Sequence, residues 1–232
     1  MSRRLPAGLL PLLFLAACGN PAADLEPHRA AVLKKLEAFD AAGRTARAES
    51  AIRANSLRIP GPAPSFPPGS HNSVLLSLED FPDLTTASKE SRLVVVNPLY
   101  RIAAWARKGK TPWGTDLRRK EVDQLQSEIP AFLQLKYVLV ARTIRVVEPQ
   151  LAGNDFRGGS IQADAILIDL DDGTSLGGLS FRGSNDDVVS VKDRSEKAWL
   201  AGNLRKNTLA ALASAFQQQV PGASPPVEEP AR

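Results

Sequence analysis

Hydrophobic and polar residues alternate with a period of two through residues 137–182, and this pattern predicts three consecutive antiparallel strands. The first strand begins at Tyr137 and is rich in β-branched residues, which favour strands. The second is expected over Ile161 to Leu170 and the third over Ser175 to Phe181. Between these two, Asp172-Gly173 is the residue pair typical of a tight primed turn, in which both central residues have positive φ. The C-terminal half is therefore expected to contain a three-strand meander.

Two shorter apolar runs upstream, Ser73 to Leu78 and Arg92 to Asn97, predict two further strands. Apolar residues spaced three or four apart predict a long helix from about Pro27 to Ala54, a second helix over 117–132 that Pro130 ends or kinks, and a third over 193–218. We therefore expect an α+β fold. Its mostly antiparallel sheet of about five strands would be packed against helices on one face, with a long N-terminal helix.

The first residues have the pattern of an export signal. Arg3 and Arg4 precede a short apolar run, Leu9 to Leu15, and small residues follow at Ala16-Ala17. The apolar run is too short to span a membrane as a permanent helix. We therefore exclude residues 1–17 from the folded body, as a signal peptide.

Cys18, the one cysteine of the chain, comes directly after this segment. The motif Leu15-Ala16-Ala17-Cys18 resembles the lipobox of bacterial lipoproteins, and the resemblance implies cleavage before Cys18 and lipidation of its thiol. Gly19 follows where an aspartate would favour the inner membrane, which implies an outer-membrane, periplasm-facing lipoprotein, or a cell-membrane one in a source with a single membrane. The alternatives are an ordinary secretory signal with a chance cysteine, or a buried structural cysteine.

Composition divides the rest of the chain. The prolines between residues 59 and 72 forbid a helix and favour an extended conformation, so this segment is expected to be a semi-rigid spacer. The Pro- and Glu-rich C-terminus is expected to be disordered. The expected organisation is a signal peptide (1–17), a lipidated tether (18–26), an N-terminal helix (27–58), the spacer (59–72), an α+β domain (73–219) and a disordered tail (220–232).

Net charge indicates little about partners, because the formal value of +4 falls to +2 once Arg3 and Arg4 are removed with the leader. The distribution of charge is more informative: basic residues are concentrated between residues 101 and 120, and aromatic residues interleave with them. Arg and Lys supply charge while Trp is amphipathic, so such a run can face an acidic partner or an anionic envelope component. The alternative is a solvated basic face with the tryptophans in the core. The candidate partner-binding residues are Tyr100, Arg101, Trp105, Arg107, Lys108, Lys110 and Trp113.

Motifs for catalysis are incomplete. Residues 104–111 fit a phosphate loop only loosely, because Trp105 and Arg107 would crowd a backbone that must wrap a phosphate. Residues 178–182 miss the last glycine of a nucleophile elbow, and no histidine follows His71 to act as a base. The aspartates at 169–172 are explained by hairpin-turn chemistry better than by a calcium loop. We therefore expect no enzyme activity, no cofactor and no metal site.

The second half of the chain, about Leu117 to Gln218, resembles the periplasmic domains of outer-membrane lipoproteins related to the curli secretion lipoprotein and to lipoprotein activators of peptidoglycan synthases. The resemblance rests on a helix leading into Tyr137-Val138-Leu139-Val140, on the hairpin Ala165 to Gly173, and on a final amphipathic helix. Those families have a similar Leu-x-Asp-x-x-Thr-Gly hairpin, usually followed by an aromatic residue, where this chain has Leu179 or Phe181. The resemblance implies a non-catalytic accessory role and transfers no binding residue.

The function predicted from these observations is that of a non-enzymatic, membrane-anchored lipoprotein, an accessory, assembly or regulatory factor for an envelope protein partner. The alternative is a periplasmic module that binds a lipid, a small apolar molecule or an anionic envelope polymer. Binding of a small apolar molecule would require an unfilled apolar pocket of several hundred Å³, by roughly the usual size of such sites. Nucleic acid is excluded as a partner by the export signal.

Overall fold

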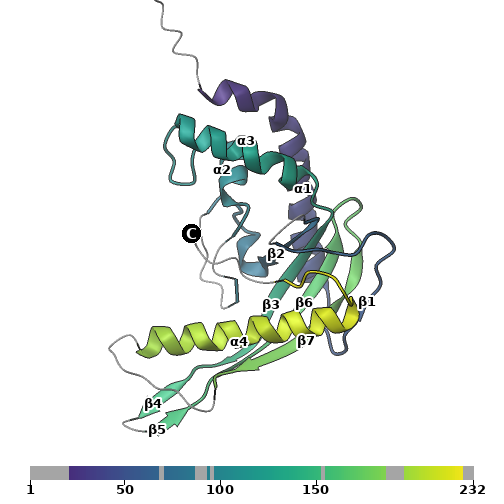
Figure 1. Cartoon of the computed structure of the whole chain (residues 1–232), viewed down its shortest axis with the longest axis vertical. Coiled ribbons are helices and arrows are strands. Elements are labelled where there is room, and N and C mark those ends of the chain that lie inside the picture. The colour runs from purple at the N-terminus through teal and green to yellow at the C-terminus, as the bar shows by residue number, and fades with distance from the viewer. Residues whose placement is uncertain are drawn as a thin grey trace, which may run out of the picture.

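The computed structural model describes residues 21–67, 71–86, 93–94, 97–152, 155–186 and 196–226. In these residues the chain forms an α+β fold with a mostly antiparallel, open sheet and a long N-terminal helix, as predicted (Figure 1). The α-helices are α1 (Glu26–Ala48), α2 (Tyr100–Lys108), α3 (Arg119–Leu133) and α4 (Glu196–Gln219), with short 3-10 helices η1 (Pro21–Leu25) and η2 (Leu78–Asp80). The strands are β1 (Ser56–Leu57), β2 (Ser73–Ser77), β3 (Tyr137–Val147), β4 (Gln150–Ala152), β5 (Asp155–Arg157), β6 (Ser160–Asp169) and β7 (Ser175–Ser184).

The main sheet has the strand order β1-β7-β6-β3-β2. The meander predicted for residues 137–182 forms its centre, because β3 pairs antiparallel with β6, and β6 with β7. At the two edges, β2 runs parallel to β3, and the short β1 runs antiparallel to β7. The hairpin β4–β5 forms a separate pair that continues from the far ends of β3 and β6, at the opposite end of the molecule from the start of α1 (Figure 1).

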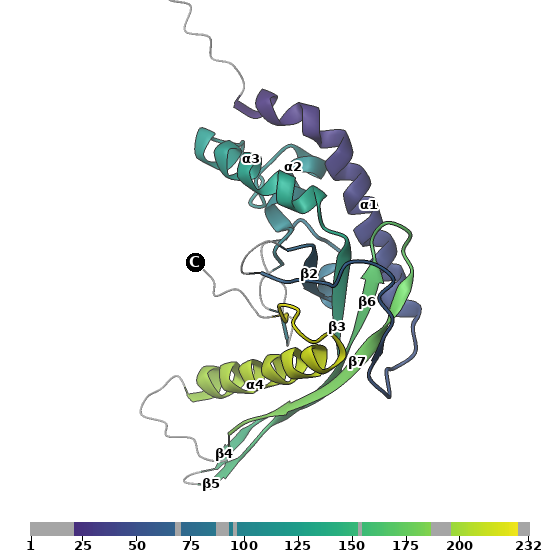
Figure 2. The same cartoon turned by 45° about the vertical axis from the view of Figure 1, so that its right-hand side comes forward.

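Two hydrophobic cores lie on opposite faces of this sheet. The first contains Val138 and Val140 of β3, Ile166 and Ile168 of β6, and the buried faces of α1, α2 and α3. The second contains Leu139 of β3, Ala165 and Leu167 of β6, and buried residues of α4. Figure 2 shows α1 and α4 on the two sides of the strands. The prediction of helices on one face was wrong, because both alternating sets of side chains in the central strands are apolar and each needs a cover.

Helix α1 ends six residues earlier than predicted, at Ala48, because Glu49 has an extended backbone conformation. Arg142 of β3 lies at this end of the helix, and its guanidinium donates to the carbonyls of Ala46, Glu49 and Ser50 at 2.7–2.8 Å. The same guanidinium makes a bidentate ion pair with Asp164 of β6, at 2.7 Å for each contact. The end of α1 is therefore set by a side chain almost a hundred residues away in the sequence.

The proline-rich segment predicted as a spacer packs onto the fold where it is described. Phe66 is fully buried in the second core, and its ring lies edge-on to Phe216 of α4, with centroids 5.3 Å apart. The Tyr137 hydroxyl donates to the carbonyl of Pro62 at 3.0 Å. The chain beyond α4 also joins this core: Val220 is buried, and the Phe66 N–H donates to the Ser224 carbonyl. The predicted boundaries at residues 59, 73 and 220 thus do not separate packed from unpacked chain.

Three local predictions differ from the structure. The described residues of the predicted strand Arg92 to Asn97, which are Leu93, Val94 and Asn97, are not in a strand, and the fifth strand of the sheet is β1 instead. Helix α2 was not predicted, because the basic residues on either side of its five consecutive buried residues, Ile102 to Ala106, give the region the composition of an exposed segment. The β6–β7 connection is not a two-residue primed turn: among the described residues only glycines have positive φ, and Asp169 N–H pairs with the Thr174 carbonyl across four residues.

Candidate functional site

An exposed tryptophan is held on a short, hydrogen-bonded loop between α2 and α3. Gly114 N–H donates to the Thr111 carbonyl, and Thr111 N–H donates to the Thr115 carbonyl, both at 2.9 Å. The two threonine hydroxyls lie 2.7 Å apart and close the loop. Pro112 and Trp113 occupy its tip, where Pro fits the first central position of such a turn. Trp113 is 70% exposed, so the loop presents a large aromatic side chain to solvent in a defined position.

A cleft of about 170 Å³ lies beside this tryptophan, between its loop and α3. Leu117 and Leu125, both buried, supply apolar surface, and Tyr100 of α2 makes an edge-on contact with Trp113 at a centroid distance of 6.4 Å. One wall of the cleft is therefore aromatic and another is aliphatic. The lining residues are Arg101, Thr111, Pro112, Trp113, Leu117, Lys120, Glu121, Gln124 and Leu125.

Two of the three charged side chains that line the cleft, Arg101 and Lys120, are cationic. Arg101 is paired with Glu128 of α3 at 2.5 Å and lies over the Tyr100 ring, 5.2 Å from its centroid. Its Nε–H is buried without an acceptor among the described residues, a cost of about 1–3 kcal/mol that a purely structural arginine would avoid. Glu121 accepts a hydrogen bond from the Arg118 N–H and caps α3. Lys120 is exposed and has no ion pair within the described part of the chain, so it is free to meet an incoming anion.

The predicted basic run is split by the fold. Trp105 is only 1% exposed, because it lies on the face of α2 that packs against α1 and α3 in the first core. Its assignment to a binding surface was therefore wrong. Arg107 is paired with Asp40 of α1 at 2.7 Å, and Lys108 donates to the Thr85 hydroxyl at 2.6 Å. Lys110 pairs with Asp116, and this contact holds the pKa of the Asp116 carboxyl below its usual value.

Of the seven predicted binding residues, two line the cleft, Arg101 and Trp113, and a third, Tyr100, contacts the Trp113 ring. Sequence reasoning missed the contribution of α3, which supplies Lys120 and Gln124 on one line of the helix and Glu121 and Leu125 on the next. Their four-residue spacing was a usable signal, because residues four apart on a helix lie side by side.

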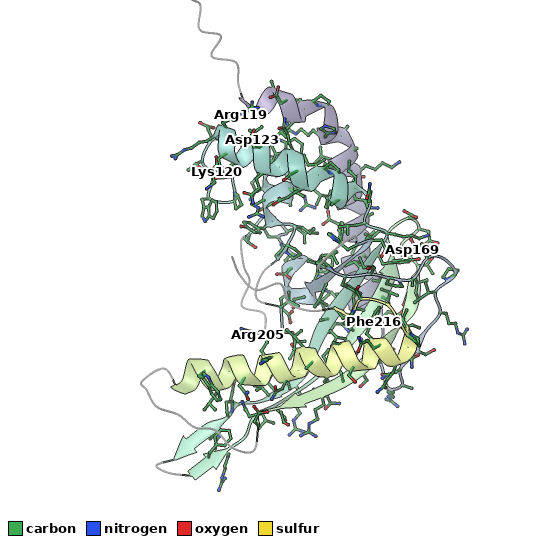
Figure 3. All side chains as sticks on the ribbon, in the orientation of Figure 1. Arg119, Lys120, Asp123, Asp169, Arg205 and Phe216 are labelled. Atoms are coloured by element: carbon green, nitrogen blue, oxygen red, sulfur yellow. The ribbon has the colours of Figure 1, made fainter. Side chains whose placement is uncertain are left out.

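The cleft is close to η1, the first element of the described chain. Arg119, at the start of α3, makes an ion pair with Asp24 of η1 at 3.1 Å. Figure 3 shows Arg119, Lys120 and Asp123 together at this end of α3, beside the start of α1. Leu25 of η1 is fully buried in the first core, so the packed chain begins within a few residues of Cys18. Cys18 itself lies outside the described residues.

The β6–β7 hairpin carries a second polar cluster. The Lys136 ammonium lies 3.8 Å from an Asp169 carboxylate oxygen and 3.9 Å from one of Asp171. Burial lowers the pKa of the Lys35 ammonium, and the negative charges of the same two aspartates oppose this by raising it. Asp169 accepts a hydrogen bond from the Asp171 N–H, and Asp172 accepts one from the Thr174 N–H, as hairpin-turn aspartates do. Within the described ranges, no group of three or more His, Cys, Asp or Glu side chains is arranged to hold a metal ion. This cluster is therefore explained by the geometry of the turn.

Among the helices that the structure describes, none has the length and apolar character needed to cross a membrane. Comparison of the chain with models of protein families, with curated proteins and with solved structures finds no match in any of the three.

Proposed function

We propose that the mature protein is a non-enzymatic lipoprotein, anchored through Cys18, that acts as an accessory factor by binding an envelope protein partner in the α2–α3 cleft. The observation that carries this proposal is the fixed, exposed Trp113 beside an apolar cleft with an unpaired Lys120. Exposing a large aromatic ring has a cost in water, and Trp and Arg are the residues most enriched among those that dominate protein–protein affinity.

The size and chemistry of the cleft favour a protein partner over a free ligand. Its volume of about 170 Å³ is below the roughly 300–1,000 Å³ of typical small-molecule sites. A single side chain of a partner would fill it. The apolar walls suit an aliphatic or aromatic side chain, and Lys120 suits a neighbouring carboxylate. The expected ligand is therefore an apolar residue flanked by an acidic one on the surface of another protein.

The position of the cleft restricts where that partner can be. Two residues, Gly19 and Asn20, separate Cys18 from Pro21, where η1 begins, and the three chain steps from Cys18 to Pro21 span at most about 10 Å when fully extended. Because η1 is tied to the start of α3 by the Asp24–Arg119 ion pair, a lipidated Cys18 would hold the cleft near the bilayer surface. We therefore expect a partner that is itself a membrane protein or lies against the membrane.

A photo-crosslinking residue placed at Gln124, which lines the cleft and is exposed, tests this function in intact cells. We expect a discrete adduct with an envelope protein, reduced at least tenfold by Trp113→Ser. The matched control is Trp199→Ser, which removes a tryptophan that is 46% exposed on α4, away from the cleft, and should leave the adduct unchanged. Equal adduct yield in all three proteins would refute the proposed binding site.

A further inference from the structure

The three central strands extend beyond the helices that cover the first core. Next to this end of the strands, the cover on that face is the end of α1 and the loop after it. Two hydrogen bonds attach this loop to the sheet: the Ile52 N–H donates to the Asp164 carboxylate at 2.9 Å, and the Ser180 N–H donates to the Asn55 side-chain oxygen at 2.7 Å. Strands β3, β6 and β7 continue past this loop, toward the β4–β5 end of the molecule (Figure 1).

The strand register identifies which side chains lie on this uncovered face. Arg145 of β3 pairs with Gln162 of β6, and Gln162 pairs with Arg182 of β7, so the three form one row across the sheet. All three side chains are exposed. Because side chains alternate along a strand, this row lies on the same face as Asp164, which is two residues along β6 from Gln162. The opposite face of these strands is covered by α4, as Val146 and Ile161 show by packing in the second core.

A β-bulge adds apolar surface to the row. The register shifts between Thr143 and Arg145, so Ile144 and Arg145 both oppose Gln162. Ile144 is 49% exposed, and Val147, two residues after Arg145 on the same face, is 43% exposed. Two of the four large exposed hydrophobic residues in the described chain therefore border this arginine row.

The charge of the row is not balanced by the protein itself. No ion pair involves Arg145 or Arg182 within the described ranges, and the one hydrogen bond of Arg182 to another side chain is to Ser160, at 3.3 Å. The acidic residues that follow these strands have partners of their own. The Asp186 carboxylate accepts hydrogen bonds from the side-chain amides of Asn203 and Asn207 at 2.8 and 2.9 Å. Glu148 likewise interacts with another group of the protein. Arg145 and Arg182 thus lie on strands two spacings, or about 10 Å, apart, and both side chains are exposed on the same face.

We infer that this face, defined by Ile144, Arg145, Val147, Gln162 and Arg182, is a second docking surface for an acidic protein. Arginines beside exposed aliphatic side chains are typical of protein–protein interfaces, where Arg is enriched and supplies bidentate contacts to carboxylates. The aliphatic residues favour a protein surface over a polysaccharide, which offers them no apolar contact. The partner surface is expected to have two carboxylates about 10 Å apart, flanking apolar residues.

The test uses the full-length protein in its own cells, with a photo-crosslinking residue at Gln162. We expect a discrete adduct with a second protein, reduced at least tenfold when Arg145→Glu and Arg182→Glu are combined. The matched control combines Arg44→Glu and Arg47→Glu, an equal change of charge at exposed positions of α1, and should leave the yield unchanged. An unchanged Tm of all variants shows that folding is not the cause, because these side chains are exposed.

Identification of the crosslinked peptide completes the test. We expect it to contain at least two Asp or Glu residues, and their reversal to Lys should restore the adduct with the Arg145→Glu, Arg182→Glu protein. Four results would overturn the inference: no adduct, equal loss in both charge variants, a crosslinked peptide without acidic residues, or an adduct with lipid, polysaccharide, a second copy of this chain or its own residues 187–195. The Gln124 adduct at the cleft is measured separately, so failure of one surface does not imply failure of the other.

Discussion

At the scale of single residues, Arg142 is the side chain that the fold uses most fully. Its five N–H donors are all engaged: Nε and Nη2 with Asp164, Nη1 with the carbonyls of Ala46 and Glu49, and Nη2 also with that of Ser50. Both charged partners are buried, and the guanidinium joins β3, β6 and the end of α1. Only Arg has the donor number and planar geometry for this arrangement.

Removal of Arg142 should therefore destabilise the protein strongly. Arg142→Met leaves Asp164 charged, buried and without its partner, and we expect a loss of about 3–5 kcal/mol in the free energy of unfolding, measured with urea. Combining it with Asp164→Leu should recover part of this loss, because the unpaired charge is removed. The recovery should be incomplete, since three carbonyls of residues 46–50 still lack a donor. A loss below 1 kcal/mol for the single variant would contradict this account.

Tyr137 predicts a pH dependence at the same scale. Burial raises the pKa of its phenol above the usual value of 10.0, so the folded state favours the neutral form. The unfolded chain loses this proton first, and stability present below about pH 10 is lost as the pH rises through the folded-state pKa. Tyr137→Phe also removes the hydrogen bond to Pro62, worth about 1 kcal/mol at neutral pH.

The measurement is urea unfolding of both proteins at pH 8 and pH 11. The stability advantage of the wild-type protein over Tyr137→Phe should shrink at pH 11, because only the wild type has this proton to lose. An advantage that stays the same at both pH values would show that the Tyr137 phenol does not have a raised pKa.

At the scale of elements, β7 and α4 approach each other closely at Gly183. A Cβ on this residue would lie 2.4–2.5 Å from backbone atoms of Thr208 on α4. Gly202, on the same helix, has open space at the Cβ position. The two glycines thus have opposite roles: one permits close packing of a helix on a sheet, and the other lies in an exposed part of a helix.

Gly183→Ala and Gly202→Ala form a matched pair that tests this packing. The first should destabilise the protein by about 1–3 kcal/mol, because backbone must move to admit the methyl group. The second should stabilise it by up to about 1 kcal/mol, since Ala is the better helix former. Thermal unfolding followed by circular dichroism measures both. A neutral Gly183→Ala would mean that α4 is not held as closely to β7 as the structure shows.

At the scale of the whole molecule, the two candidate surfaces are built on different elements. The cleft is lined by residues of α3, whose start is tied to η1 by the Arg119–Asp24 ion pair, and the arginine row lies on β3, β6 and β7, strands that run toward the β4–β5 end (Figure 1). The residues predicted as spacer do not loosen this arrangement, because Phe66 and Pro62 contact the sheet and α4. On the proposed anchoring, the arginine row would extend away from the membrane while the cleft faces it.

The anchor itself can be tested on the whole protein. Cys18→Ser should release the protein from the membrane fraction into the soluble fraction, with the urea midpoint of unfolding unchanged, because Leu25, seven residues further on, is the first core residue of the described chain. Mass spectrometry of the wild-type N-terminal peptide should show an acylated Cys18. An unmodified thiol, or equal membrane association of both proteins, would refute the lipoprotein assignment and the membrane-proximal position of the cleft.

Local pattern was sufficient to predict much of the architecture. Strands β3, β6 and β7 and helices α1, α3 and α4 follow from periods of two and of three to four, because those repeats are properties of the backbone itself. The same period of two divides the residues of β3 between the two faces: Tyr137, Leu139 and Ala141 enter one core, and Val138 and Val140 the other. Of the aromatic and basic residues predicted as a binding surface, Arg101 and Trp113 line the cleft.

Long-range contacts determined the rest, and no local pattern contains them. Arg142 ends α1 from another strand, β1 replaces the expected strand at 92–97, and the second core draws in Phe66 from a segment that composition alone marks as a spacer. The same reason separates two similar tryptophans: Trp105 lies where α2 meets α1 and α3, and Trp113 lies where nothing described covers it. Burial depends on which elements meet, and that is a property of the assembled fold.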